Sequence, residues 1–172
     1  MDTLLAPSLR RRLSSMLYES MLLFGVLFIA GMLFSTIFQQ RHALNLRHAL
    51  GMWLFLVLAV YFLWFWCHGG QTLAMKTWRI RLVDETGGRV NLFRATTRYL
   101  LSWGWFLPGL VLAWALDAKG WMLVGIPTFN LLLWALSVFA NPQRQFLHDI
   151  VAGTRLIDVS PQSAKVAPPA KV

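Results

Sequence analysis

The sequence has few charged residues and a single cysteine. Charged residues make up 13% of its 172 residues, only 7 residues are Asp or Glu, and hydrophobic residues reach 57%. Soluble domains usually carry about 25% charged residues, so this composition excludes an ordinary soluble domain, and its hydrophobicity excludes a disordered chain. Because Cys67 is alone, a disulfide framework within the chain is excluded as well. The composition indicates a membrane protein.

Long apolar runs are what the sequence does contain. A helix needs roughly 20 apolar residues to cross a bilayer. Four runs approach or reach this length, and they lie at residues 20–38, 50–67, 99–116 and 121–140. Aromatic residues make up 14% of the chain and include nine Trp, which fits rings that collect at membrane interfaces. The sequence therefore predicts an all-α membrane protein with four transmembrane helices.

The distribution of basic residues predicts how these helices are oriented. Most Lys and Arg residues lie before the first run, between the second and third runs, or after the fourth, whereas Arg41, Arg47 and Lys119 lie in the other two loops. By the positive-inside rule, both termini are cytoplasmic. The net charge of +9 is then explained by topology and by anionic lipid at the cytoplasmic face. Nucleic acid is not needed as a partner.

The loop between the second and third runs shows signs of ordered structure. Residues 77–83 alternate between polar and apolar, which is typical of a half-exposed strand. Residues 84–88 have the composition of a turn, and residues 89–92 are a candidate returning strand. A further strand-like run at residues 154–159 is a candidate partner for residues 78–83. We therefore expect a small cytoplasmic β element.

The segment after the fourth run predicts one more helix and then a tail. Asn141 followed by Pro142 is typical of a helix start, and Gly153 of a helix end, so a C-terminal amphipathic helix is expected from Asn141 to about Ala152. Residues 160–172 are rich in Pro, Ala and Ser and predict a disordered cytoplasmic tail. The membrane domain is thus expected to cover residues 1–159.

Three segments resemble the RDD family of small bacterial membrane proteins. They are RRLSSMLYE at residues 11–19, GQTLAMK at residues 70–76 and RQFLHDIVAGTRLI at residues 144–157. The resemblance covers about residues 10–159 and implies a multi-pass protein of the bacterial inner membrane. It also implies a transport-related role, because some members of the family are described as sodium/proton antiporters.

The family takes its name from one arginine and two aspartates. The positions that match them are Arg12, Glu19 and Asp149. Glu19 stands where the family usually has an aspartate, which keeps the charge but lengthens the side chain. Arg12 and Glu19 are seven residues apart, on nearly the same helix face and about 10.5 Å apart along the axis, so each is expected to pair elsewhere. The expected partners are Asp149 for Arg12, and Arg94, Arg98 or Arg144 for Glu19.

These charged residues support two hypotheses. In the first, the chain exchanges cations for protons, which requires a carboxylate that exchanges protons near neutral pH, a polar cavity that reaches the midplane, and a homo-oligomer to enclose the pathway. In the second, Arg12, Glu19 and Asp149 form a structural clasp, and the cytoplasmic face docks a partner or anionic lipid. The second hypothesis predicts paired carboxylates and a dry interior.

The sequence offers little support for an enzyme. His148 adjoins Asp149, but neighbours on a helix point about 100° apart, so no catalytic dyad is expected. His42, His48 and His68 lack the spacing of a metal site, and Cys67 supplies no second thiolate. We therefore predict no enzymatic activity, no cofactor and no metal site.

Overall fold

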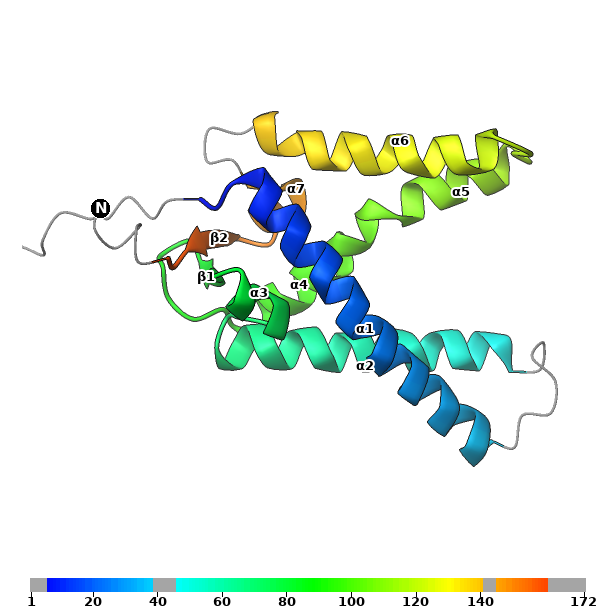
Figure 1. Ribbon diagram of the computed structural model, residues 1–172, viewed down its shortest axis with the longest axis horizontal. Coiled ribbons are helices and arrows are strands. Elements are labelled where there is room, and N and C mark those ends of the chain that lie inside the picture. The colour runs from blue at the N-terminus through cyan, green and yellow to red at the C-terminus, as the bar shows by residue number, and fades with distance from the viewer. Residues whose placement is uncertain (1–5, 39–45, 141–144, 161–172) are drawn as a thin grey trace, which may run out of the picture.

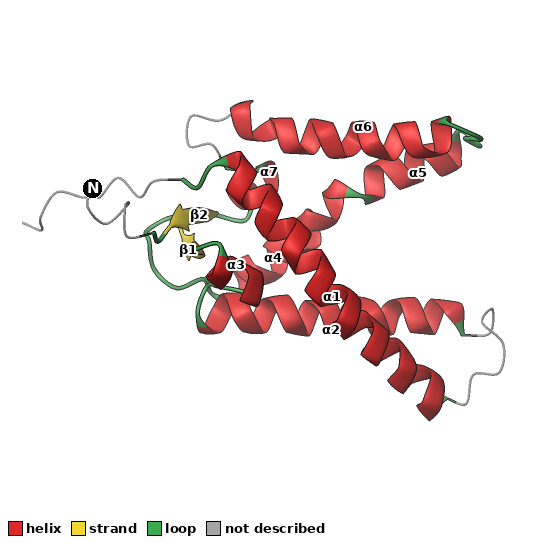
Figure 2. Ribbon diagram, viewed as in Figure 1, coloured by secondary structure: helices red, strands yellow, loops and turns green. Residues whose placement is uncertain are grey.

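The chain is mostly helical in the computed structural model, which describes residues 6–38, 46–140 and 145–160 (Figures 1 and 2). Its elements in chain order are α1 (Leu9–Ile37), α2 (Arg47–His68), α3 (Leu73–Thr77), β1 (Ile80–Asp84), α4 (Leu92–Ser102), the 3₁₀ helix η1 (Trp103–Trp105), α5 (Leu107–Ala115), α6 (Met122–Leu136), the 3₁₀ helix η2 (Ser137–Ala140), α7 (Leu147–Val151) and β2 (Thr154–Asp158).

The short elements gather at one end of the molecule. Figure 1 shows β1, β2, α3 and α7 together beside the start of α1 and the end of α2, and we call this region the sheet end. The connection between α5 and α6 lies at the opposite end. The long helices run between the two ends, α1 packs across α2, and α5 packs beside α6.

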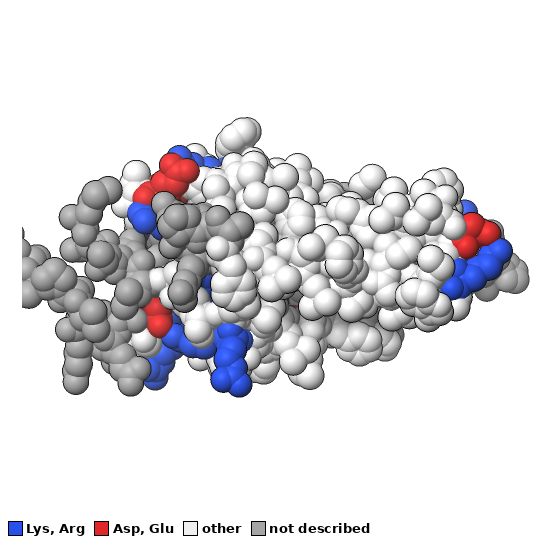
Figure 3. All heavy atoms as spheres, turned by 90° about the horizontal axis from the view of Figure 1, so that it is seen from above, with Lys and Arg blue, Asp and Glu red and all other residues white. Residues whose placement is uncertain are grey.

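Among the described residues, three helices are long and apolar enough to cross a membrane, at Leu9–Ile37, Arg47–His68 and Met122–Phe139. Large apolar side chains on them face outward, such as Phe24, which is 73% exposed, and Val60, which is 70% exposed. On the face shown in Figure 3, charged residues lie at the two ends and an uncharged middle separates them. An exposed apolar belt between two charged ends suits lipid rather than water, as expected for a membrane protein.

The third predicted span, residues 99–116, is not one continuous helix. It is divided among α4, η1 and α5, which together carry the chain from the sheet end to the opposite end (Figure 1). Pro108 lies in the first turn of α5 and has no N–H with which to continue a helix from α4. The nine residues of α5 are about 13.5 Å long, too short to cross a bilayer alone. Four continuous spanning helices are therefore not confirmed.

A polar side chain from α6 stabilises this break. Asn130 donates from Nδ2 to the carbonyl of Trp105 at 2.7 Å and to that of Gly104 at 3.2 Å. A broken helix is tolerated in an apolar region when a neighbouring helix satisfies the freed carbonyls. A Cβ on Gly104 would lie 2.4 Å from the Trp134 ring, so only glycine permits this close packing of η1 on α6.

The predicted sheet is confirmed, but the predicted hairpin is wrong. β1 pairs antiparallel with β2, so that Ile80 lies opposite Asp158 and Asp84 opposite Thr154. Residues 84–88 form the expected turn, in which Gly87 has a φ of 88°. No strand returns at residues 89–92, because Asn91 caps α4 by accepting a hydrogen bond from the Arg94 N–H at 2.8 Å.

The C-terminal helix is shorter than predicted. α7 ends near the expected residue, and Gly153 follows it with a φ of 63°. Its predicted start at Asn141 lies outside the described residues, whereas Phe146, which the prediction placed inside the helix, is extended with a ψ of 156°. Gln145 instead exchanges two hydrogen bonds with the backbone of Leu156, at 3.0 and 3.1 Å. At Gln145, this contact with β2 takes the place of the predicted helical structure. The predicted tail, residues 160–172, lies outside the described residues except for Ser160.

Candidate functional site

Charged and polar side chains are buried together near the sheet end. Five of them come from α1, α4 and α7 and are between 0% and 8% exposed; we call them the polar cluster: Arg12, Glu19, Arg98, His148 and Asp149. Charged residues are almost never buried unless they are paired, so each of these side chains needs a partner. The partners differ from those predicted.

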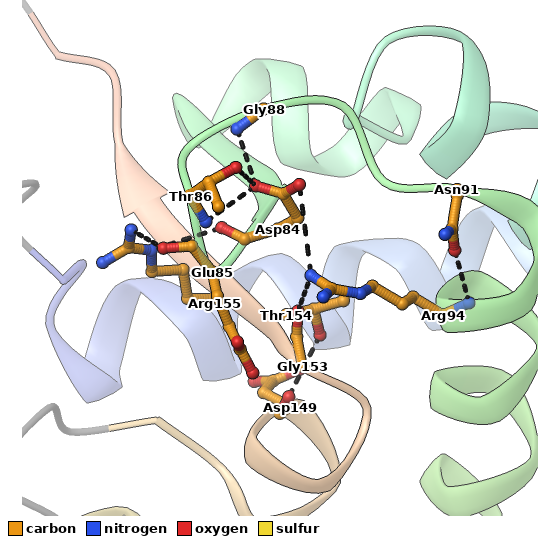
Figure 4. Close-up of polar contacts among 10 residues, drawn as sticks. All are labelled: Asp84, Glu85, Thr86, Gly88, Asn91, Arg94, Asp149, Gly153, Thr154 and Arg155. Carbon is orange, nitrogen blue, oxygen red and sulfur yellow. Dashed lines mark hydrogen bonds and ion pairs between the residues drawn. The ribbon is translucent and has the colours of Figure 1, made fainter.

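Asp149 pairs with Arg98 and is completely buried. The Nε and Nη2 atoms of Arg98 each lie 2.8 Å from Asp149 Oδ1. The guanidinium also lies over the ring of Trp66, 4.3 Å from its centroid. The Asp149 carbonyl accepts a hydrogen bond from Thr154 at 3.2 Å, drawn in Figure 4. These contacts fasten α7 to α4 and to β2.

His148 is a neutral imidazole in this cluster. Trp134 donates from its indole N–H to His148 Nδ1 at 3.2 Å, so the ring proton is on Nε2, which lies 3.4 Å from Asp149 Oδ1. Burial lowers the pKa of His148 to about 4; Asp149 opposes this shift, and Arg98 and Arg12 add to it. We predicted that His148 and Asp149 point apart, and this was wrong, because in the short α7 both face the cluster.

Glu19 is held by hydroxyl groups and not by an arginine. Tyr61 donates from its hydroxyl to Oε1 at 2.5 Å, and Thr72 donates to Oε2. Thr72 also caps α3 by accepting a hydrogen bond from the Met75 N–H at 3.3 Å. The site of Glu19 therefore joins α1, α2 and the start of α3.

None of the three predicted arginine partners is shown to contact Glu19. Arg98 is bound to Asp149, and Arg94 donates to the Gly153 carbonyl at 2.9 Å. Arg94 also lies 4.0 Å from Asp84 Oδ2, so it connects the turn after β1 with the corner before β2 (Figure 4). Arg144 lies outside the described residues. Sequence reasoning missed Thr72, although it lies within the motif at residues 70–76, and Tyr61, which is hidden in an apolar run.

The turn beside Arg94 also stabilises an ionised carboxylate. Hydrogen bonds from the Thr86 hydroxyl and from the backbone N–H groups of Gly88 and Thr86 lower the pKa of Asp84, and the charge of Arg94 adds to them. Arg155 reaches the same turn from β2 and donates to the carbonyls of Asp84 and Glu85 (Figure 4). This part of the molecule holds the sheet together.

Arg11 is a fastening residue that sequence reasoning missed. It forms an ion pair with Asp158 and donates to the carbonyl of Trp78, which fastens α1 to the ends of both strands. Partial burial raises the pKa of Asp158, but hydrogen bonds from Arg11 and Ser160 outweigh this and lower it overall. The neighbouring Arg10 and Arg12 offered no means of telling which arginine takes this role.

Arg12 is not paired with Asp149, contrary to our prediction. No ion pair joins the two within 4.0 Å, and Arg12 donates from Nε to the Pro7 carbonyl at 3.0 Å. Its guanidinium lies 5.4 Å from the centroid of Phe146. Asp149 Oδ1 is already taken by Arg98, which leaves Arg12 as a second buried cation near one carboxylate.

A cavity of about 290 Å³ lies against the polar cluster. Arg12, Glu19, Arg98 and His148 contribute to its lining, and the remainder is mainly aromatic and aliphatic. Its walls come from α1, α2, α3, α4, η1, α7 and the sheet. A concave, mostly apolar site with a few convergent polar groups is the usual form of a small-ligand site. Within the described ranges, no group of three or more His, Cys, Asp or Glu is placed to hold a metal ion.

Comparison with known proteins identifies the family of this fold. Nothing among curated proteins or solved structures matches the chain. The profile of the RDD family matches residues 6–153, which include all five residues of the polar cluster. The chain therefore belongs to the RDD family.

Proposed function

We propose that this chain exchanges a cation for protons across the membrane, with Glu19 as the carboxylate that binds them in turn. The observation that supports the proposal is the position of Glu19: it lies on the wall of the cavity, within a candidate membrane-spanning helix, and is 7% exposed. A carboxylate in such a position is by default a functional candidate. The proposal assigns no enzymatic activity and no cofactor.

The groups around Glu19 suit a site at which a proton and a cation bind in turn. The hydroxyl groups of Tyr61 and Thr72 both donate to the carboxylate. A hydroxyl can also accept, so the same oxygens can turn their lone pairs to a cation bound at Glu19. Small hard cations prefer oxygen ligands of this kind. The proposal includes a homo-oligomer, because the three continuous candidate spans and the one broken passage of the described residues enclose little of a pathway by themselves.

Reconstituted protein tests this proposal directly. Proton flux driven by gradients of Na⁺, K⁺ or Li⁺ is measured in proteoliposomes that contain the wild-type chain, Glu19→Gln or Glu85→Gln. Glu85 is exposed in the turn after β1, so it serves as a matched control. We expect cation-dependent flux that Glu19→Gln abolishes and Glu85→Gln keeps, with equal insertion of all three proteins. Absence of flux from the wild type with every cation, or full flux from Glu19→Gln, would overturn the proposal.

A second candidate function is a structural or accessory membrane protein whose sheet end docks anionic lipid or a partner. Two observations favour it. Arg98 and Asp149 form an ion pair in which the Asp149 side chain is completely buried. The pair fastens α4 to α7, as a structural clasp does. The sheet end also presents exposed basic side chains: Arg10, Lys76, Arg79, Arg81 and Arg89. By the positive-inside rule this end faces the cytoplasm of a bacterial inner membrane, where it meets anionic headgroups.

This second function predicts a response to lipid charge. The wild-type chain in nanodiscs is expected to be more stable with phosphatidylglycerol than with phosphatidylcholine, and added salt should remove the difference. Replacement of both Arg79 and Arg81 by Gln should reduce it. Equal stability in the two lipids at low salt would exclude lipid docking at this face.

A further inference from the structure

Arg12 is a buried cation whose guanidinium has unused donors. It is 2% exposed, and its Nη1 and Nη2 atoms have no hydrogen-bond partner among the residues that the structure describes. Nε donates to the carbonyl of Pro7, an uncharged group. A buried cation is expected to be matched by an anion and by acceptors for its N–H groups, because its transfer out of water is costly. Arg12 lines the cavity, so the missing acceptor has room there.

The other charges of the cavity already have partners. Arg98 is neutralised by Asp149, and Glu19 accepts hydrogen bonds from Tyr61 and Thr72. His148 is neutral, because burial lowers its pKa to about 4. Arg12 is therefore the side chain of the polar cluster that can take an additional anion. The two Nη groups of a guanidinium form a planar fork that matches two oxygens of a carboxylate or phosphate.

Most of the remaining lining of the cavity is aromatic or aliphatic, although Glu19 and several hydroxyl side chains also belong to it. Its wall along α1 runs from Arg12 to Leu23, about 16 Å at about 1.5 Å per residue. Leu58 and Phe62 of α2 also line it. Met16 and Phe106, which are 38% and 50% exposed, also line it, so the cavity meets the apolar outer surface. A ligand that enters from lipid can reach Arg12 by this side.

We propose that the cavity binds an amphipathic anion, whose carboxylate or phosphate is held by Arg12 and whose single alkyl chain lies along α1 toward Leu23. The charge of Arg12 selects the headgroup, and the aromatic and aliphatic walls select the chain. This binding does not depend on cation exchange at Glu19.

Binding of dodecanoate tests the proposal. The wild-type chain is placed in phosphatidylcholine nanodiscs, and labelled dodecanoate is titrated in competition with dodecyl phosphate, dodecanol and acetate. We expect saturable binding that dodecyl phosphate displaces and that dodecanol and acetate displace poorly. The acetate arm separates a free anion from an amphipathic one. Equal displacement by dodecanol would show an apolar cavity without anion selection and would overturn the proposal, as would absence of saturable binding.

Matched variants test the role of Arg12. Arg12→Met is expected to weaken dodecanoate binding about tenfold or more, because charge-assisted hydrogen bonds are lost. Arg10→Met makes the same replacement at an exposed neighbour and should leave binding unchanged. Unchanged binding by folded Arg12→Met would overturn the proposal. Proton flux by Glu19→Gln is measured separately, so failure of the exchange function and failure of this site are distinguishable.

Photolabelling of the wild-type chain requires no variant and remains decisive if Arg12→Met fails to fold. A dodecanoate with a diazirine at the end of its chain is expected to label peptides from the cavity wall, around Leu23 and Leu58, and excess dodecanoate should prevent this. Labelling spread over the outer faces of the helices, without competition, would overturn the proposal.

Discussion

The two acidic positions of the RDD pattern lie in contrasting surroundings. Asp149 is completely buried, is paired with the arginine of another helix and lies in the short α7. Glu19 lies within a long apolar helix, accepts hydrogen bonds from two uncharged hydroxyls and lines a cavity. The ion pair of Asp149 with Arg98 suits a structural role. Among the described residues, Glu19 contacts only uncharged donors, so no cation of that part of the chain occupies its carboxylate. The sequence pattern alone treats the two positions as equivalent, and their surroundings separate them.

The largest effect should follow loss of the Asp149 charge. Asp149→Asn leaves Arg98 buried without its ion-pair partner, and breaking a buried ion pair costs about 3–5 kcal/mol. The free energy of unfolding in detergent measures this. Asp158→Asn is the control, because its ion pair with Arg11 is partly exposed and should matter less. Equal losses in the two variants would remove the contrast between a buried clasp and a surface pair.

The Asp149 region should also respond to pH through His148. The pKa of His148 is about 4 in the folded chain, below the ordinary value of 6.5, so between these values the unfolded chain binds a proton that the folded chain does not. The stability that the neutral His148 contributes is therefore fully present above pH 6.5 and falls by about 3 kcal/mol as the pH drops to 4. Unfolding measured from pH 7 to 4 should show this loss, and His148→Gln should flatten it. His68→Gln, at an exposed position, should leave the slope as it is.

Replacement of Glu19 should be much less damaging to stability. Glu19→Gln keeps an acceptor oxygen for one of its two hydroxyl donors and leaves no cation newly unpaired, so a loss of about 1 kcal/mol is expected. The same unfolding assay compares it with Asp149→Asn. If the two variants lose equal stability, Glu19 belongs to the clasp, and the division between the two sites fails.

The smallest effect is expected at the opposite end of the molecule. Lys119 and Asp117 form an ion pair of 2.7 Å, and their side chains are 81% and 84% exposed. Exposed pairs contribute little because water and salt screen them. Lys119→Ala should therefore leave the unfolding free energy unchanged within error, which gives the reference for the buried pair. A loss comparable with that of Asp149→Asn would mean that charge at both ends, rather than burial, controls stability.

Much of the fold was predictable from local sequence signals. Apolar length predicted helices that became α1, α2 and α6. Alternation at residues 77–83 and a strand-like run at residues 154–159 predicted the strands that pair as β1 and β2. The three segments that resemble the RDD family pointed to the family and to three residues of the polar cluster, Arg12, Glu19 and Asp149. Each of these signals is carried by neighbouring residues, because helix and strand periodicity depend on short spacings.

The pairing within the site was not predictable in the same way. The sequence offered Arg94, Arg98 and Arg144 as partners of Glu19, whereas the fold gives Arg98 to Asp149 and gives Tyr61 and Thr72 to Glu19. These choices depend on which helices cross near their polar residues. A hydroxyl in an apolar run carries no local sign of the distant carboxylate that it will meet.

By itself, the sequence determined that the chain is an apolar, helical membrane protein of the RDD family with a small sheet, because hydropathy and short-range periodicity act within each segment. Only the tertiary structure decided that the passage through residues 99–116 breaks at η1, where Asn130 donates hydrogen bonds to the backbone carbonyls of η1. It also decided that Asp149 is clasped while Glu19 faces a cavity and Arg12 retains unused donors. The physical reason is that a buried polar group takes the partner that packing brings within hydrogen-bonding distance, and packing joins residues far apart in the chain.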